Sequence, residues 1–99
     1  MFLVRRTNPF GTAAELDAAI FRALVCTKAF PGMKWIRTYY TPGVKAAYCV
    51  YEAKSADDIA AYSRLANAPY DEIVEVGELT RDAYWTPEVE RERAPLLVG

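Results

Sequence analysis

The sequence predicts a single α+β domain in which four antiparallel strands carry two helices on one face. The chain has 99 residues, 53% of them hydrophobic, which suffices for one core but not two. Its hydrophobic pattern alternates between periods of two and 3.6 residues in the order strand, helix, strand, strand, helix, strand. A turn signal between the two central strands indicates a hairpin. Together these features are typical of the split β-α-β-β-α-β arrangement.

The first strand and the first helix are separated by a clear change of period. Phe2 to Arg6 is a short β-branched and aromatic run that ends before Asn8-Pro9, so it predicts a strand followed by a turn. Thr12 and Glu15 have the spacing of a capping box. Apolar residues at helical spacing then predict a helix from about Ala13 to Ala29.

The central segments predict a β-hairpin. Lys34 to Thr41 and Ala46 to Ala53 are rich in aromatic and β-branched residues. Thr41-Pro42-Gly43-Val44 joins them, with proline second and glycine third in the turn. These two strands are therefore neighbours in the sheet.

The remaining two elements complete the fold. Ser55 can cap a second helix that ends near Asn67-Ala68-Pro69. Glu72 to Thr80 alternates in hydrophobicity and predicts the last strand. The predicted fold is thus a ferredoxin-like sandwich, with a four-stranded antiparallel sheet and both helices on one face.

The uncovered face of this sheet also carries large side chains. Strict alternation sends Trp35, Arg37 and Tyr39 to one side of the second strand and bulky residues to the other. An antiparallel sheet with one wet face shows cleaner polar alternation, so we expect a second copy of the chain to cover this face. The expected assembly is a homodimer of the α/β-barrel type, enclosing a pocket for a small molecule.

The composition of the third strand suggests which side faces the partner. Small residues at Ala47 and Cys49 suit close packing against helices, which sends Tyr48 and Val50 to the open face. Arg37 is expected there too, because a buried arginine is easier to satisfy beside a cavity. The reverse assignment stays open from the sequence.

The chain divides at about residue 80. Residues 1–80 hold the six predicted elements, and residues 81–99 form an extension that contains Tyr84 and Trp85. A disordered tail usually has fewer large apolar groups. We therefore expect the extension to pack on its own domain or across a dimer partner.

Charge and composition narrow the possible partners. Twelve basic and thirteen acidic residues give a formal charge of -1 without a basic cluster, which argues against a nucleic-acid partner. No apolar segment reaches membrane-spanning length, and the N-terminus lacks a basic region before an apolar run, so we expect a cytoplasmic protein without a membrane partner. The two cysteines are expected to be buried free thiols.

The absence of histidine excludes several kinds of chemistry. Ser-His and Cys-His catalysis and all-imidazole metal sites need a residue type that this chain lacks. Any chemistry depends on Tyr, Arg, Lys, Cys or carboxylates. No cofactor and no metal ligand are predicted.

Several motifs resemble a small bacterial family long labelled a domain of unknown function. The similarity runs from about Lys34 to Leu79 and includes Trp35-Ile36-x-x-Tyr39, Ala47-Tyr48-Cys49-Val50-Tyr51-x-Ala53 and Ile73-x-Glu75-Val76, with Ile59, Arg64, Ala66 and Pro69 between them. The resemblance implies a ferredoxin-like fold and a homodimer. Some members are called nickel-binding proteins and usually carry histidine where this chain has Arg37 and Tyr62. Neither replacement is a good nickel ligand, because guanidinium has no free lone pair and phenol is protonated.

The candidate ligand-binding residues are Arg37, Tyr39, Tyr48, Tyr62 and Glu75. The Arg37 guanidinium suits a carboxylate or phosphate, although pairing with a glutamate such as Glu75 is an equal alternative. The tyrosines can donate hydrogen bonds or simply reflect sheet propensity. Two function classes follow: a small-ligand-binding protein, which we favour, or a cofactor-independent oxygenase, isomerase or cyclase. Nickel binding, as in relatives, is a third alternative.

Overall fold

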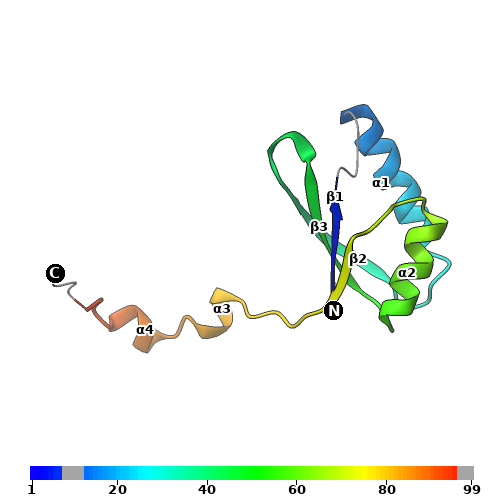
Figure 1. Cartoon of the computed structure of the whole chain (residues 1–99). Coiled ribbons are helices and arrows are strands. Elements are labelled where there is room, and N and C mark those ends of the chain that lie inside the picture. The colour runs from blue at the N-terminus through cyan, green and yellow to red at the C-terminus, as the bar shows by residue number, and fades with distance from the viewer. Residues whose placement is uncertain (8–12, 96–99) are drawn as a thin grey trace.

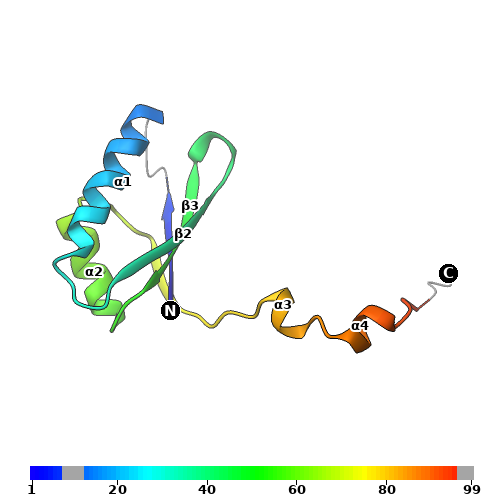
Figure 2. The same cartoon turned by 180° about the vertical axis from the view of Figure 1, so that it is seen from behind.

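The strands form a single antiparallel sheet with both long helices on one side. The computed structural model describes residues 1–7 and 13–95. Strands β1 (Phe2–Thr7), β2 (Lys34–Tyr40), β3 (Ala46–Glu52) and β4 (Glu72–Glu75) lie in the order β2-β3-β1-β4. Helices α1 (Ala13–Thr27) and α2 (Ala56–Leu65) cover the same face (Figures 1 and 2). This is the predicted ferredoxin-like α+β fold.

The element boundaries differ from the prediction chiefly at the last strand. β4 ends at Glu75, whereas the alternation of the sequence predicted a strand up to Thr80. After β4 the backbone makes one more sheet-like contact, in which the Val76 amide donates to the Met1 carbonyl at 2.9 Å. β1 begins at Phe2, so β4 has no partner strand beyond this point. The predicted capping box and the turn before α1 involve residues 8–12, which lie outside the described residues.

The hairpin between β2 and β3 closes as its turn chemistry predicted. The three-residue turn η1 (Pro42–Val44) contains Gly43 at φ 76° and ψ 5°, a left-handed conformation that glycine adopts without strain. The Thr41 amide donates to the Ala46 carbonyl, and the Ala46 amide donates to the Thr41 hydroxyl, both at 3.0 Å. Proline and glycine therefore shape the turn, and Thr41 joins its ends.

Helix α2 begins at the predicted cap. The Ser55 hydroxyl accepts a hydrogen bond from the Asp58 amide at 3.1 Å, and Asp57 and Asp58 place negative charge at the positive end of the helix. The chain leaves the helix through Asn67, which has a positive φ of 54°. Asparagine is one of the few residues that tolerate this conformation, so it suits the end of a helix.

The core lies between the sheet and α2. The buried apolar and aromatic residues come from β1, β3, α2 and the residue after it: Phe2, Val4, Ala47, Cys49, Tyr51, Ile59, Tyr62 and Ala66. None of them belongs to the part of α1 whose side chains are described, residues 15–27, where Ala23 and Cys26 are only partly buried against this cluster. Both cysteines are free thiols, and Cys49 is buried as expected, whereas Cys26 is only partly buried. Helix α1 is thus less closely packed on the sheet than α2.

A β-bulge in β2 corrects the predicted side-chain directions of that strand. Trp35 pairs with Tyr51, but the next pair joins Arg37 to Val50, so Ile36 is the extra residue. The bulge sends Trp35 to the helix side, where its Nε1 donates to the Thr38 hydroxyl at 2.9 Å. The prediction that Trp35 shares a face with Arg37 was therefore wrong, because it assumed unbroken alternation.

The C-terminal extension leaves the domain. Helices α3 (Arg81–Tyr84) and α4 (Pro87–Arg91) have no buried residue and lead away on the side opposite α1 and α2 (Figures 1 and 2). The radius of gyration is 17.9 Å, compared with about 13 Å for a compact domain of this length. Up to residue 95, the extension does not pack on its own domain, and packing across a partner stays a prediction. In the described ranges no helix has the length and apolar character needed to cross a membrane.

Candidate ligand-binding site

Three of the five predicted site residues share the open face of the sheet. Arg37 lies opposite Val50, and Tyr39 lies opposite Tyr48, in the pairing of β2 with β3. Ala47 and Cys49 point to the other side and are buried beneath the helices. This arrangement is the one that the small residues of β3 predicted. Tyr39 is 57% exposed, so its side chain is available to a partner or a ligand.

Arg37 is paired with a different glutamate from the one that the sequence suggested. Its Nη1 lies 3.8 Å from Glu78 Oε1, and its hydrogen bond with the Tyr39 side chain, followed by the Glu78 charge, raises the pKa of Arg37. β3 and β1 separate β2 from β4 in the sheet. The chain after β4 must therefore turn across the open face to bring Glu78 to Arg37.

Glu75 does not join this cluster. It lies opposite Phe2 in the pairing of β1 with β4, which places it on the helix side at the exposed edge strand. The prediction that Glu75 contributes to a pocket on the open face is corrected by this register. Alternation within the short strand β4 sends Glu72 and Val74, not Glu75, to the open face.

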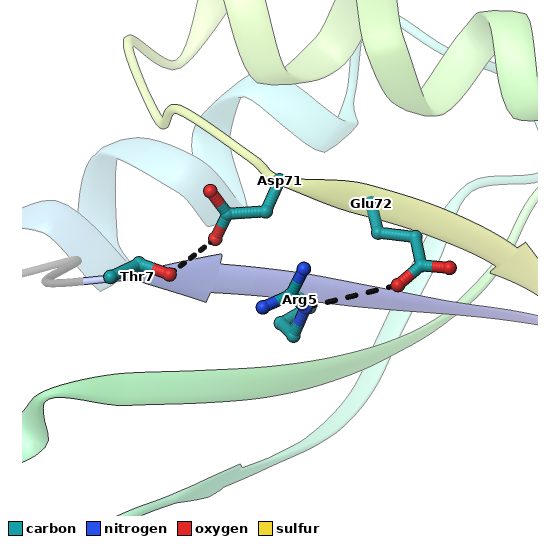
Figure 3. Close-up of polar contacts among 4 residues, drawn as sticks. All are labelled: Arg5, Thr7, Asp71 and Glu72. Atoms are coloured by element: carbon teal, nitrogen blue, oxygen red, sulfur yellow. Dashed lines mark hydrogen bonds and ion pairs between the residues drawn. The ribbon is translucent and has the colours of Figure 1, made fainter.

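Polar contacts also tie β4 to β1 at one end of the open face (Figure 3). Arg5 Nε lies 3.8 Å from Glu72 Oε2, and the Thr7 hydroxyl donates to Asp71 Oδ2 at 2.6 Å. The Asp71 amide also donates to the Arg5 carbonyl at 2.8 Å. Arg5 and Arg37, the arginines described on the open face, therefore each form an ion pair with a glutamate.

Tyr62 lies on the opposite face, inside the core. It projects from α2 toward β3, is 1% exposed, and its hydroxyl oxygen is 3.4 Å from that of Tyr51. Burial raises the pKa of Tyr62, and the neighbouring Tyr51 raises it further. The predicted grouping of Tyr62 with Arg37 is wrong for a single chain, because the sheet lies between them.

The helix side also contains a buried arginine that the sequence analysis did not select. Arg6 is 3% exposed, and its Nη1 donates to the carbonyls of Ala68 and Pro69 while its Nη2 donates to the Ser63 hydroxyl at 3.3 Å. No ion pair among the described residues involves Arg6. The alternation of side chains along β1 could have predicted the burial of Arg6, since Phe2, Val4 and Arg6 all point to the same side of the strand.

A cavity of about 260 Å³ lies beside Arg6, between α1 and the sheet. Its walls are mostly apolar and aromatic and come from α1, β2, β3 and α2, including Leu16, Ile20, Trp35, Cys49, Tyr51 and Tyr62. The incomplete burial of α1 explains why space remains there. The cavity and the cluster around Arg37 are thus two separate candidate sites, on opposite faces of one sheet.

Neither site has the donor set of a metal centre. Within residues 1–7 and 13–95, no three histidine, cysteine, aspartate or glutamate side chains come together in a way that would hold a metal ion. The chain has no histidine at all. Arg37 and Tyr62, the two positions for which the resemblance implied histidine in relatives, lie on opposite faces of the sheet.

These features define a small ferredoxin-like α+β protein with an uncovered sheet face and an apolar cavity. The chain belongs to the SCO4226-like family, described as nickel responsive protein SCO4226-like, whose family model matches residues 2–76. The crystal structure of SCO4226 from Streptomyces coelicolor A3(2) is similar, with a TM-score of 0.68 and 24% sequence identity over 80% of this chain and 98% of that chain. At this identity the similarity shows the fold. No curated protein matches the chain.

Proposed function

We propose that this protein is a homodimeric small-ligand-binding protein that associates through the open face of its sheet. The observation that carries the proposal is the uncovered row of apolar and aromatic side chains on that face, which register assigns to β1, β2, β3 and β4: Leu3, Tyr39, Tyr48, Val50 and Val74. A monomer rarely leaves such a surface in water. A second copy presents the same face, so it can cover the surface symmetrically.

The proposed ligand lies between the two sheets and contacts Arg37, Tyr39 and Tyr48. Arg37 supplies a planar cation beside the apolar and aromatic row, and its ion pair with Glu78 is 3.8 Å long and partly exposed. Such a pair contributes little to stability, so an anionic group of a ligand can replace Glu78 at low cost. Tyr39 and Tyr48 add aromatic surface and hydroxyl groups that hydrogen-bond a small organic molecule.

The proposed ligand is an organic molecule, although the family description refers to nickel. Nickel sites in proteins favour imidazole, thiolate or several carboxylates. Arg37 and the two tyrosines offer none of these at neutral pH. Catalysis is the alternative that the sequence left open.

The interface is tested by sedimentation equilibrium of the wild type and two matched variants. Val50→Glu places a charge at the centre of the open face, and Phe21→Glu places the same charge on α1, where Phe21 is 71% exposed. We expect a dimeric wild type, a monomeric but folded Val50→Glu variant, and a dimeric Phe21→Glu variant. A monomeric wild type, or a Val50→Glu variant that remains dimeric, would contradict the proposed interface.

Native mass spectrometry tests the ligand separately. We expect the wild-type dimer to retain a small organic adduct, and Arg37→Gln to lose it while staying dimeric. Stoichiometric uptake of added nickel by the wild type would instead support the metal function of the family. Circular dichroism of each variant distinguishes lost binding from lost structure.

A further inference from the structure

We propose that the cavity between α1 and the sheet is a binding site for a small monocarboxylate with an apolar body, held at its charged end by Arg6 and Arg22. This site lies on the face of the sheet opposite the proposed dimer interface. The proposed carboxylate site can therefore be tested independently of the dimer and ligand proposed above.

The first support is the uncompensated charge at one end of the cavity. Arg6 is almost completely buried, and it donates to the Ala68 and Pro69 carbonyls and the Ser63 hydroxyl. Burial lowers the pKa of Arg6, but the Tyr51 and Cys49 side chains also interact with Arg6 and raise its pKa overall. No carboxylate is among these partners within the described residues. Burying a guanidinium without a counter-ion is costly. A ligand carboxylate would supply the missing negative charge.

The second support is that another arginine reaches the same end. Arg22 extends from α1, lines the cavity, and donates from its Nε to the Ala66 carbonyl at 2.8 Å. No ion pair among the described residues involves Arg22. The carbonyls at the C-terminal end of α2 offer about half a negative charge, against two full positive charges. One carboxylate would come close to balancing this excess.

The third support is the character of the remaining walls. Away from the arginines, the cavity is lined by apolar and aromatic groups: Leu16, Ala19, Ile20, Ala23, Trp35 and Ala47. Such a surface favours an alkyl chain or an aromatic ring over a sugar or a free inorganic anion. A ligand with one charged end and one apolar end matches both parts of the cavity.

The volume limits the size of the ligand. The cavity of about 260 Å³ is larger than the apolar cavity of about 150 Å³ that is known to hold benzene. It is slightly below the range for drug-sized ligands, which begins at about 300 Å³. An acid with a single aromatic ring or a medium-length alkyl chain therefore fits, and a dinucleotide does not.

The native fluorescence of the chain provides a direct readout. The sequence contains two tryptophans, of which Trp35 lines the cavity and Trp85 lies in the exposed extension. In a Trp85→Phe background all tryptophan emission comes from the cavity wall. Titration with phenylacetate or octanoate should give a saturable change, and 2-phenylethanol, which lacks the charge, should bind about tenfold more weakly or worse.

Matched variants on α1 test the location. Ala19 lines the cavity and Ala18 next to it is exposed, so Ala19→Phe fills the space while Ala18→Phe makes the same change at a solvent-exposed position of the same helix. We expect Ala19→Phe to abolish phenylacetate binding and Ala18→Phe to leave it unchanged. Arg22→Gln removes one cation from an exposed position and should weaken phenylacetate binding about tenfold without affecting 2-phenylethanol.

Several results would overturn the proposal. These are equal affinity for phenylacetate and 2-phenylethanol, binding of inorganic phosphate as tight as that of phenylacetate, or undiminished binding by a folded Ala19→Phe variant. The absence of a saturable response to either acid would do the same. Because Val50→Glu changes only the opposite face, it should bind phenylacetate like the parent protein even if it is monomeric.

Discussion

Tyr51 of β3 and Tyr62 of α2 meet inside the core, with their hydroxyl oxygens 3.4 Å apart and their ring centroids 5.4 Å apart at an interplanar angle of 63°. The edge-to-face geometry is favourable for aromatic rings, and the two buried hydroxyls lie within hydrogen-bonding distance of each other. Phe30 adds a second edge-to-face contact to Tyr62 at 6.3 Å. This cluster fastens α2 to the sheet.

Removing the hydroxyl of Tyr62 should cost less than removing the ring. Tyr62→Phe loses one long hydrogen bond and should lower the free energy of unfolding by about 1 kcal/mol. Tyr62→Ala also leaves a cavity and should lower it by about 3–5 kcal/mol. Urea unfolding followed by circular dichroism measures both. Tyr84→Phe, at an exposed position of the extension, is the control and should have no effect.

The same two tyrosines predict a loss of stability at alkaline pH. Burial raises the pKa of both Tyr51 and Tyr62 above the ordinary value of about 10. Above about pH 10 the unfolded chain loses these protons while the folded chain keeps them, so the free energy of unfolding falls as the pH rises. The slope is at most about 1.4 kcal/mol per pH unit for each tyrosine.

Urea unfolding between pH 8 and pH 11 measures this slope. Tyr62→Phe should make the decline shallower above pH 10 and leave the pH dependence near neutrality unchanged. A decline of the same steepness in wild type and variant would show that Tyr62 does not cause it. Ultraviolet absorbance of the phenolate form gives an independent measure of the pH range in which the tyrosines ionise.

The cap of α2 should contribute to stability more than a similar cap in the extension. Ser55 and Thr86 each accept a hydrogen bond from an amide three residues later, at 3.1 Å and 3.2 Å. Ser55→Ala should lower the free energy of unfolding by about 1 kcal/mol. Thr86→Ala should leave it unchanged, because α4 does not pack on the domain. An equal effect of both substitutions would contradict the independence of the extension.

Truncation after Thr80 tests the role of the extension in assembly. The residues lost include Tyr84, Trp85 and Val89, which are exposed in the single chain and so available to a partner. We expect truncation to weaken dimerisation, measured by sedimentation, and to leave the unfolding midpoint of the dissociated protein unchanged. An unchanged dimerisation constant would contradict the prediction that the extension packs across a dimer partner.

Local patterns predicted most of the fold because they act within a few residues. Gly43 takes the left-handed turn position, Ser55 caps α2, and the small residues Ala47 and Cys49 face the helices, all as their neighbours in the sequence suggested. The error in β2 arose because a single extra residue, Ile36, reverses the direction of every residue before it. No local signal marked that bulge.

The composition of the candidate sites depended on contacts between distant parts of the chain. The sequence by itself determined the order of the elements and the absence of imidazole chemistry, and it favoured the open-face position of Arg37, Tyr39 and Tyr48 that the strand register then showed. Only the tertiary structure decided that Glu78 pairs with Arg37, that Tyr62 is in the core, and that Arg6 and Arg22 line the same cavity. These pairings follow from how α1, α2 and the chain after β4 pack, and packing sums many weak contacts across residues remote in the sequence.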